Sequence, residues 1–454
     1  MAYQTTNPYN GKTGETFPEY DAGQLEAKLD CAAACFTSWR MKSFSERAAV
    51  LARAATIMRE RSEQLASLIT LEMGKLIAQS RGEVALSAAI LDYYAQNAER
   101  FLAPETLPTT KGEAVLENSP IGVLFGVEPW NYPYYQIARF AAPNLMAGNV
   151  VMVKHASNVP QCARAFEQLM TQAGAPAGAY TNLFISKQQV EQVIDDPRIR
   201  GVALTGSEAA GAVVAARAGQ NLKKTTMELG GNDAFIVLED ADLELAVRHA
   251  VSGRMGNSGQ ACTASKRFIV VEPLAERFLE RFQAGLAEFK PGDPMDVQTT
   301  LAPLSSEAAL ENLLDQVQRA LANGARAILG GQRLDRPGAF MAPTILTDVD
   351  AANPAYKEEF FGPVALFFRV ADEAAALALT NDSPFGLGGS VFTQDIERGK
   401  RLASQVETGM MFINSAATSA PELPFGGIKN SGYGRELSAA GIQEFVNKKL
   451  IRVG

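Results

Sequence analysis

A cysteine near the middle of the chain has the surroundings of a nucleophile. Cys262 ends a turn rich in glycine, asparagine and serine, Gly253-Arg-Met-Gly-Asn-Ser-Gly-Gln-Ala-Cys262. A helix expected over residues 241–255 leads into the turn, and a β-branched run, Phe268 to Val271, follows it. A thiol at the end of such a loop is open to a substrate and close to backbone N–H groups that favour its thiolate form. The position therefore suits attack on a carbonyl carbon.

Two polar residues could complete this chemistry. Glu228 precedes two glycines in Met227-Glu-Leu-Gly-Gly-Asn232, and Asn131 stands between prolines in Glu128-Pro-Trp-Asn-Tyr-Pro133. A carboxylate can act as general base, and a side-chain amide can donate to an oxyanion. Each residue also has a plainer interpretation, Glu228 as a surface charge at a strand end and Asn131 as the cap of the following helix.

Composition limits the class of protein. A chain of 454 residues predicts two or three domains, and its 47% hydrophobic and 20% charged residues are typical of a soluble globular protein. The net charge of −8, without a long Lys/Arg run, argues against a nucleic-acid partner. The polar N-terminus is unlike a signal peptide, and no apolar stretch approaches the ~18 residues of a membrane span. We therefore expect a cytoplasmic protein with no membrane partner.

The cysteines and histidines favour neither disulfides nor metal. The four cysteines are Cys31, Cys35, Cys162 and Cys262, too few for a disulfide framework in a chain of this length. With two histidines in the chain, a zinc site is not expected. Cys31, Cys35 and Cys162 lie in helical patterns and are expected in the core.

The order of predicted elements indicates an α/β fold. Residues 22–104 have helical patterns, and Glu113–Glu117 and Ile121–Val127 resemble two strands of a hairpin. Beyond residue 134 short apolar strands alternate with helices, which is typical of parallel sheets covered on both faces. The expected strands of this region are 150–154, 181–185, 201–205, 234–238, 268–271, 327–329 and 365–370. No repeat or low-complexity linker separates the domains, so they should pack together around a site.

Phosphate binding is only weakly indicated. No Gly-x-Gly-x-x-Gly follows a predicted strand, but Thr205-Gly206-Ser207 connects a strand to a helix whose first N–H groups could bind an anion. Ser207 as a simple helix cap is the plainer alternative. Lys154 ends an apolar strand, where α/β sheets bind ligands, and a lysine that only extends to solvent is equally compatible with its position.

Seven motifs together resemble the aldehyde dehydrogenase superfamily over essentially the whole chain. They are Pro129-Trp-Asn131, Gly148-Asn149 with the Lys154 strand, Thr205-Gly206-Ser207, Glu228-Leu-Gly-Gly231, Gly259-Gln-Ala-Cys262, Glu358-Glu-Phe-Phe-Gly-Pro363 and Pro424-Phe-Gly-Gly427. The resemblance implies two Rossmann-like parallel-sheet domains and a small β oligomerisation element. The implied cofactor-binding domain is 1–104 and 128–228, the catalytic domain 229–427, and the oligomerisation hairpin and tail 105–127 and 446–454. A homodimer or homotetramer is expected.

The resemblance also implies a mechanism. Cys262 attacks the aldehyde, and the oxyanion is held by the Asn131 side chain and the Cys262 N–H. Hydride leaves for a nicotinamide, and Glu228 activates the water that hydrolyses the resulting thioester. Glu228 would also help to deprotonate the thiol.

The cofactor residues follow from the same resemblance. Lys154 would bind the adenosine ribose and Glu359 the nicotinamide ribose, and a solvated charge is the plainer interpretation of Glu359. The remaining cofactor-binding residues are Trp130, Ser157, Gly206, Ser207 and Phe361. Ser157 stands where strict NAD enzymes of the family tend to have glutamate, so NADP is expected to be preferred and NAD also accepted. His155, beside Lys154, is expected to be structural.

Within the superfamily, segments 154–162 and 423–437 resemble the compact bacterial succinate-semialdehyde dehydrogenases. Arg139 and Ser419 are the candidates for binding the distal carboxylate of this substrate, although a salt-bridged Arg139 is an equal alternative. Many semialdehyde dehydrogenases have an arginine six residues before the nucleophile, where this chain has Gly256, and Arg254 is not expected to point inward.

Three other functions are alternatives to this one. A dehydrogenase of neutral or aromatic aldehydes is the first alternative. A CoA-acylating enzyme would not need Glu228, and a non-catalytic binding protein would not need Cys262.

Overall fold

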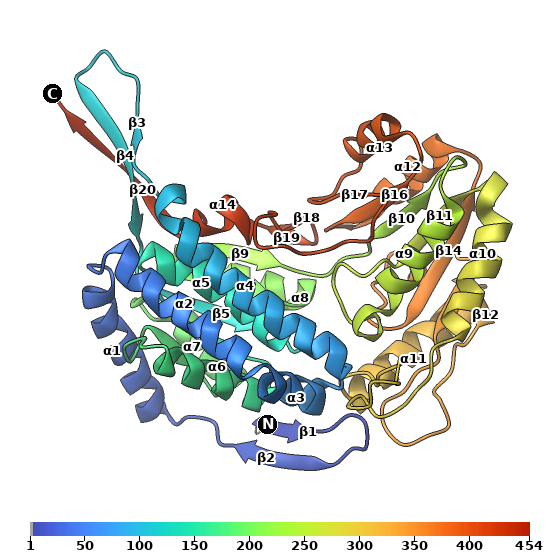
Figure 1. Ribbon diagram of the computed structural model, residues 1–454, viewed down its shortest axis with the longest axis horizontal. Coiled ribbons are helices and arrows are strands. Elements are labelled where there is room, and N and C mark those ends of the chain that lie inside the picture. Colours follow the sequence, from blue (N-terminus) through green and yellow to red (C-terminus); the bar gives the residue numbers. More distant parts are fainter. Residues whose placement is uncertain (1–2) are drawn as a thin grey trace.

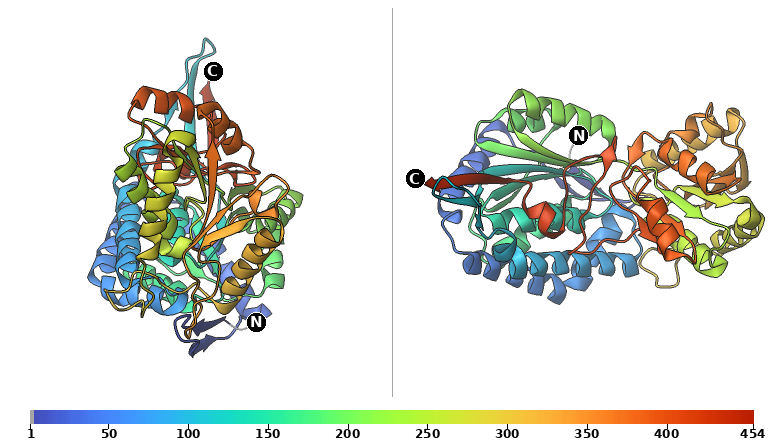
Figure 2. Two further views of the ribbon diagram at one scale, coloured as in Figure 1. Left: turned by 90° about the vertical axis from the view of Figure 1, so that its right-hand side faces the viewer. Right: turned by 90° about the horizontal axis from the view of Figure 1, so that it is seen from above.

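A computed structural model describes residues 3–454 as two layered α/β bodies with a projecting β arm (Figure 1). The right-hand view of Figure 2 shows the two bodies side by side from above. Both contain predominantly parallel sheets, which confirms the predicted fold class. No helix in the stretch from residue 3 to residue 454 has both the length and the apolarity to cross a membrane.

The first body is built on a six-stranded sheet of order β19-β9-β8-β5-β6-β7. Its strands are β5 (Val123–Glu128), β6 (Val150–His155), β7 (Tyr180–Asn182), β8 (Ile199–Thr205), β9 (Lys224–Glu228) and β19 (Gly432–Tyr433). All neighbours are parallel except β9 and β19. In the register, Glu128 pairs with His155 and Thr205 pairs with Glu228, so polar residues end four neighbouring strands at one edge.

Helices cover both faces of this sheet. On one face lie α5 (Pro133–Ala147) and α6 (Pro160–Gln172), beneath a second layer of α2 (Phe44–Glu60), α3 (Ser62–Met73) and α4 (Ile77–Phe101). On the other lie α7 (Lys187–Asp195) and α8 (Glu208–Gln220) (Figure 2). The long helix α1 (Ala22–Trp39) packs along β5, β6 and β7. The predicted run of helices over 22–104 is thus α1 to α4. All residues of α5 are buried, because this helix lies between the sheet and α4.

The second body contains a seven-stranded sheet of order β12-β13-β14-β11-β10-β16-β17. Its strands are β10 (Ala234–Val237), β11 (Arg267–Val271), β12 (Arg326–Leu329), β13 (Thr344–Thr347), β14 (Val364–Val370), β16 (Gly389–Phe392) and β17 (Phe412–Ile413). Only β12 is antiparallel to its neighbour. Alternate residues of β10 face opposite layers, as a strand requires. Phe235 and Val237 pack with α9 and α10, and Ile236 with α11, α12 and α13. These helices are α9 (Leu243–Met255), α10 (Glu272–Ala287), α11 (Glu307–Ala322), α12 (Glu373–Asn381) and α13 (Ile396–Ala403).

The predicted hairpin between 113–117 and 121–127 is wrong. The first segment is β4 (Glu113–Pro120), which pairs with β3 (Glu105–Thr106) and with the C-terminal β20 (Val446–Val453) to form the arm. The second is β5, a central strand of the first sheet. Most of β5 is buried, so its apolar residues require neighbours and helices on every side, whereas β4 is only half-buried. Residues 123–127 therefore belong to the first body.

Short elements complete the chain. They are β1 (Tyr3–Thr6), β2 (Thr13–Phe17), β15 (Phe385–Gly386), β18 (Ile428–Lys429), α14 (Ser438–Ile442) and the 3-10 turns η1 (Gly256–Gly259) and η2 (Pro354–Tyr356). β1 pairs with β2, and β15 with β18.

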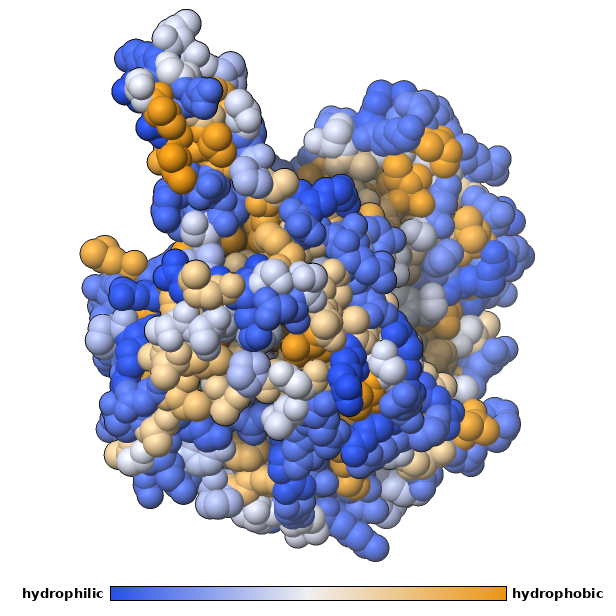
Figure 3. All heavy atoms as spheres, turned by 60° about the vertical axis from the view of Figure 1, so that its left-hand side comes forward, coloured by the Kyte–Doolittle hydropathy of each residue, from blue (hydrophilic) through white to orange (hydrophobic). Residues whose placement is uncertain are grey.

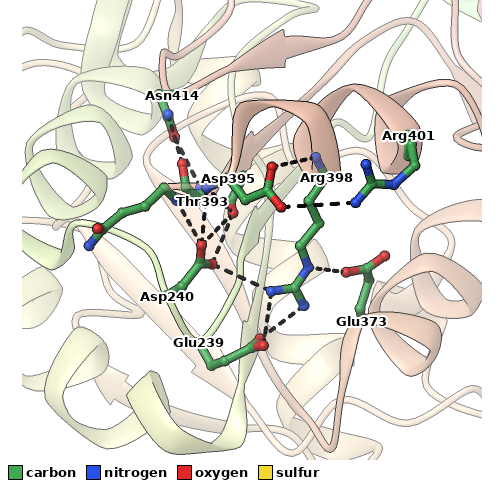
Figure 4. A network of polar contacts seen from close by, with 9 residues as sticks. Glu239, Asp240, Glu373, Thr393, Asp395, Arg398, Arg401 and Asn414 are labelled. Carbon is green, nitrogen blue, oxygen red and sulfur yellow. Dashed lines mark hydrogen bonds and ion pairs between the residues drawn. The ribbon is translucent and has the colours of Figure 1, made fainter.

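A polar network fixes the end of β10 against β16 and α13 (Figure 4). The Asp240 carboxylate accepts bonds from the Thr393 hydroxyl (2.8 Å) and from the N–H groups of Gln394 (2.9 Å) and Asp395 (3.2 Å). Arg398, on α13, pairs with Glu239 at 2.9 Å. These contacts satisfy the polar groups of the loop between β16 and α13.

Candidate active site

The turn before Cys262 is held in a left-handed conformation. Asn257, Ser258 and Gly259 follow α9 with φ of 53°, 52° and 77°. A side chain at Gly259 would collide with the Gly362 carbonyl, so glycine is required there. The turn reverses the chain and leaves Cys262 half-buried as a free thiol.

Arg254 is buried and braces this turn, and it does not line the cavity at Cys262. Its guanidinium is fully buried and donates to the carbonyls of Gly259 (2.7 Å) and Val364 (3.2 Å). Burial lowers the pKa of Arg254 to about 9. Its donors thus serve the main chain.

Asn131 is joined to the nucleophile loop through its side chain. Its Nδ2 donates to the Gln260 carbonyl at 3.0 Å, and its own carbonyl accepts from Asn257 Nδ2 at 3.0 Å. The alternative that Asn131 caps α5 is wrong. No side chain at the residues just before α5 caps this helix, and the Tyr134 N–H instead donates to Glu83 at 2.8 Å. The amide is therefore aimed at the loop that carries Cys262.

A buried lysine, Lys75, forms a hydrogen bond with the main chain of Asn131. Lys75 Nζ donates to the Asn131 carbonyl at 2.8 Å, lies 3.6 Å from the centre of the Tyr132 ring, and forms an ion pair with Glu83. Both charged side chains are excluded from solvent. The pair links the start of α5 to the segment between α3 and α4.

Glu228 ends β9 in the interior of the protein, so the alternative that Glu228 is a surface charge is wrong. Within residues 3–454, no group forms a hydrogen bond with either of its carboxylate oxygens. Burial raises the pKa of Glu228 well above its ordinary value, Glu436 raises it further and Arg139 opposes the rise. Glu228 is thus a carboxyl group that holds a proton at higher pH than usual, as a general base near neutrality requires.

The two glycines after Glu228 make room for the site. A side chain at Gly230 would collide with Glu359, and a Cβ at Gly231 would lie 2.6 Å from the Cys262 carbonyl. Glu359 accepts from the Gly231 N–H at 3.1 Å and pairs with Lys266 at 2.9 Å. The Glu-Leu-Gly-Gly motif therefore brings β9, the Cys262 loop and Glu359 into contact.

A cavity of about 250 Å³ brings Cys262 and Asn131 together with most of the expected cofactor residues, whereas Glu228, Lys154 and Ser157 do not line it. It is lined by Pro129, Trp130, Asn131, Gln136, Thr205, Gly206, Ser207, Leu229, Gly230, Cys262, Glu359 and Phe361. The rings of Trp130 and Phe361 meet edge to face, with centres 5.8 Å apart. Ser207 caps α8 by accepting from the Ala210 N–H at 3.3 Å, as in the plainer alternative, and with Gly206 it brings the start of this helix to the cavity wall. Apolar walls, a carboxylate and a helix start fit part of a dinucleotide.

Lys154 and Ser157 lie at the far end of the same sheet edge. Lys154 is half-buried, with Nζ 5.5 Å from the centre of the Tyr3 ring, and Ser157 is exposed in the next loop. Burial lowers the pKa of Lys154, nearby Lys187 adds to this and Glu19 opposes it. His155 is fully buried against the carbonyls of Glu128 (3.1 Å) and Pro133 (2.8 Å), which agrees with the expected structural role.

Arg139 is buried and salt-bridged. It pairs with Glu436 and also reaches the hydroxyls of Thr205 (3.3 Å) and Tyr135 (3.4 Å). The Tyr135 hydroxyl donates to Ser419 Oγ at 3.0 Å. The salt-bridge alternative is thus realised, and Tyr135 connects the two substrate-binding candidates. Binding of a substrate carboxylate by either one stays a prediction.

Several neighbours of the site were not recognised in the sequence. Lys75 and Lys266 are single lysines, and neither belongs to a local motif that indicates a site. Glu83, Gln136 and Glu436 carry no local pattern that distinguishes them from surface residues. Their contacts join segments far apart in the chain, so spacing could not reveal them.

Comparison with known proteins identifies the family. Residues 1–451 match the family model described as the aldehyde dehydrogenase family, so the chain belongs to that family. This confirms the resemblance drawn from the seven motifs.

Three similar proteins narrow the comparison. The chain is 52% identical to a succinate-semialdehyde dehydrogenase [NADP(+)] of Deinococcus radiodurans, covering 99% of this chain and 94% of the relative. It is 47% identical to a probable succinate-semialdehyde dehydrogenase [NADP(+)] of Synechocystis, covering 99% of both. A crystal structure of succinic semialdehyde dehydrogenase from Streptococcus pyogenes in complex with NADP+ matches with TM-score 0.98 and 48% identity over 100% of both chains.

Proposed function

We propose that this protein oxidises succinate semialdehyde to succinate, with NADP as preferred cofactor and NAD also accepted. The observation that carries the proposal is the cavity in which Cys262 and Asn131 lie beside Glu359, Phe361 and Ser207. The identity of 47–52% to two succinate-semialdehyde dehydrogenases [NADP(+)] over nearly the whole chain supports the substrate and the cofactor.

The chain's own residues would carry the chemistry at the carbonyl. Cys262 Sγ attacks the aldehyde carbon, and the oxyanion accepts from Asn131 Nδ2 and the Cys262 N–H. Removing one such donor costs ~10²–10³ in rate. Burial raises the pKa of the Cys262 thiol to about 12, with Arg139 and Lys266 opposing the rise, so the proton must leave to a base during attack. We assign that base, and later the activation of water for thioester hydrolysis, to Glu228.

The nicotinamide cofactor, when bound, accepts the hydride. Glu359 and Lys154 would hold its riboses, Gly206 and Ser207 its pyrophosphate, and Trp130 and Phe361 the sides of the nicotinamide. Ser157 would adjoin the 2′-phosphate, where it can donate a hydrogen bond without adding negative charge.

The substrate carboxylate would be held at the Arg139, Tyr135 and Ser419 group. The guanidinium already faces Glu436, so a second carboxylate would share it, and the hydroxyls of Tyr135 and Ser419 would supply the remaining donors. The test is Arg139→Ala, with Ser419→Ala as the milder change. Both should raise KM for succinate semialdehyde far more than for butyraldehyde, and equal effects on the two aldehydes would contradict the clamp.

The function itself is tested by following reduced cofactor with succinate semialdehyde or butyraldehyde, each with NADP and with NAD. Cys262→Ala serves as the inactive control. Turnover that favours succinate semialdehyde and NADP is expected. Turnover of butyraldehyde alone would keep the mechanism and overturn the substrate.

We also propose an assembly and a domain division. Residues 1–104 and 123–228 would bind the cofactor, 229–427 would supply Cys262, and the arm of β3, β4 and β20 would join subunits into a dimer or tetramer. Leu450, Ile451 and Val453 support this role, because they are 60%, 41% and 60% exposed. Figure 3 shows hydrophobic atoms gathered on the projecting arm. A cytoplasmic location is proposed with it.

A further inference from the structure

A lysine that is completely excluded from solvent lies directly behind the nucleophile. Lys266 Nζ donates to the carbonyls of Ala261 (3.1 Å) and Cys262 (2.5 Å) and pairs with Glu359 Oε1 at 2.9 Å. All three ammonium protons thus have acceptors, two on the nucleophile loop and one on the cofactor-side carboxylate. A buried cation without such partners would be strongly disfavoured.

These contacts make Lys266 a junction between two parts of the site. The carbonyls that it binds belong to Cys262 and the residue before it, so the ammonium fixes the peptide plane on either side of the nucleophile. Glu359 is fixed at the same time, because its other contact is the Gly231 N–H at 3.1 Å. Because glycine is the residue at 230 and at 231, no side chain separates these groups.

We propose that Lys266 is a positioning residue that sets both the reactivity of Cys262 and the placement of Glu359 for the cofactor. Its positive charge stabilises the thiolate, and its ion pair holds the Glu359 carboxylate where a ribose can bind. This proposal deepens the proposed dehydrogenase function and rests on it.

The charged groups around Cys262 determine whether each variant should raise or lower the reactivity of the thiol. The groups that act on the thiol come from several elements: Arg139 of α5, Tyr132 before α5, Asp233 before β10, Lys266 before β11 and Glu359. Arg139 and Lys266 lower the pKa of Cys262, whereas Glu359 and Asp233 raise it. Removing Lys266 and removing the charge of Glu359 should therefore change thiol reactivity in opposite directions.

The test measures alkylation of Cys262 by iodoacetamide against pH, by peptide mass spectrometry and without aldehyde. Cys31 on α1 is exposed, so its expected place in the core is wrong, and its thiol is an internal reference. In Lys266→Met, alkylation of Cys262 at pH 7.5 should slow about ten-fold and its pH profile should move to higher pH, since one pKa unit corresponds to about a ten-fold change in thiolate. In Glu359→Gln it should become faster, by about three-fold or more.

Cofactor binding provides the second measurement. NADP affinity, followed through Trp130 fluorescence, should fall about ten-fold in Lys266→Met. If Lys266 acts through Glu359, adding Lys266→Met to Glu359→Gln should weaken binding no further. Independent, multiplying effects would overturn the positioning role, as would unchanged alkylation in a folded Lys266→Met.

Matched variants separate this role from general stability. Lys223 also donates to two main-chain carbonyls, those of Ile194 and Asp196, and lies far from Cys262 in the sequence. Lys223→Met should leave alkylation and NADP binding unchanged. If Lys266→Met does not fold, the test rests on Glu359→Gln. The proposal is then overturned if alkylation of Cys262 is no faster in Glu359→Gln than in the unchanged protein. None of these readouts depends on which aldehyde is the substrate.

Discussion

The carboxyl group of Glu228 illustrates how position sets the chemistry of a single residue. Burial and Glu436 raise its pKa, and Arg139 only partly opposes them. A general base acts only when it is deprotonated, so the fraction of active enzyme should increase with pH through a range above that of an ordinary carboxylate.

We therefore expect the rate of thioester hydrolysis to rise with pH along a limb that belongs to Glu228. Glu228→Gln keeps the shape of the side chain and cannot accept a proton, so the limb should disappear and turnover should fall by about 10²–10⁴. Rapid-mixing measurements across pH separate acylation from hydrolysis. A Glu228→Gln enzyme that retains the limb would assign it to another group.

Ser157 is the residue at which cofactor preference should be decided. Ser157→Glu places a carboxylate beside the position of the 2′-phosphate, and the two negative charges would repel each other. The ratio of kcat/KM for NADP over NAD should fall by roughly ten-fold or more. Ser157→Ala, which removes a donor without adding charge, should change it much less. Unchanged cofactor kinetics in Ser157→Glu would contradict the assignment.

At the residue scale the sequence indicated Cys262, Glu228 and Asn131 because each lies in a local pattern of glycine or proline. The structure adds that Asn131 donates to the loop that carries Cys262, and that Gly231, after Glu228, lies against the Cys262 carbonyl. The sequence could not predict that Lys75, Lys266 and Glu436 lie at the site, because their partners are elsewhere in the chain. A lone lysine or glutamate is usually a surface residue.

At the scale of elements, alternating strands and helices were enough to predict two parallel sheets. The hairpin over 113–127 failed for a definite reason. A strand pattern reports which face is buried but not which strand is the partner, and the partner of β4 is the C-terminal β20. The Gly122 turn with φ of 143° then carries the chain into β5.

The network around Asp240 should contribute to stability and not to catalysis. Asp240→Ala removes the acceptor of three bonds at the end of β10, which should lower the free energy of unfolding by about 1–3 kcal/mol. Thermal or urea unfolding measures this loss. The control is Glu397→Ala on the adjacent α13, whose pair with Lys400 is exposed, with an expected change within about 0.5 kcal/mol. Equal losses in the free energy of unfolding for the two variants would contradict a particular contribution of this network to stability.

At the scale of the whole molecule, the arm is the feature that a single chain does not explain. β20 and β4 run antiparallel over eight paired residues, and the exposed side chains of β20 include three apolar ones, Leu450, Ile451 and Val453. Exposed apolar patches of this kind mark contacts with other chains.

Leu450→Asp should therefore reduce the molar mass in solution to that of a smaller assembly. Burying a carboxylate in a subunit contact is costly, whereas the monomer would tolerate it. Light scattering after size exclusion measures the mass. Leu222→Asp is the control, because Leu222 is 96% exposed in a loop of the first body. An unchanged mass for Leu450→Asp would place the contact elsewhere.

The complete burial of α5 has a consequence for how this scaffold can change its substrate. Each of the residues from Pro133 to Ala147 already contacts the interior, so replacing one disturbs the packing that holds Asn131 and Arg139. The segment around Ser419 is only partly buried and belongs to no helix or strand. Variation in substrate choice should therefore accumulate in that loop, while α5 stays nearly constant as selection alters what the enzyme accepts.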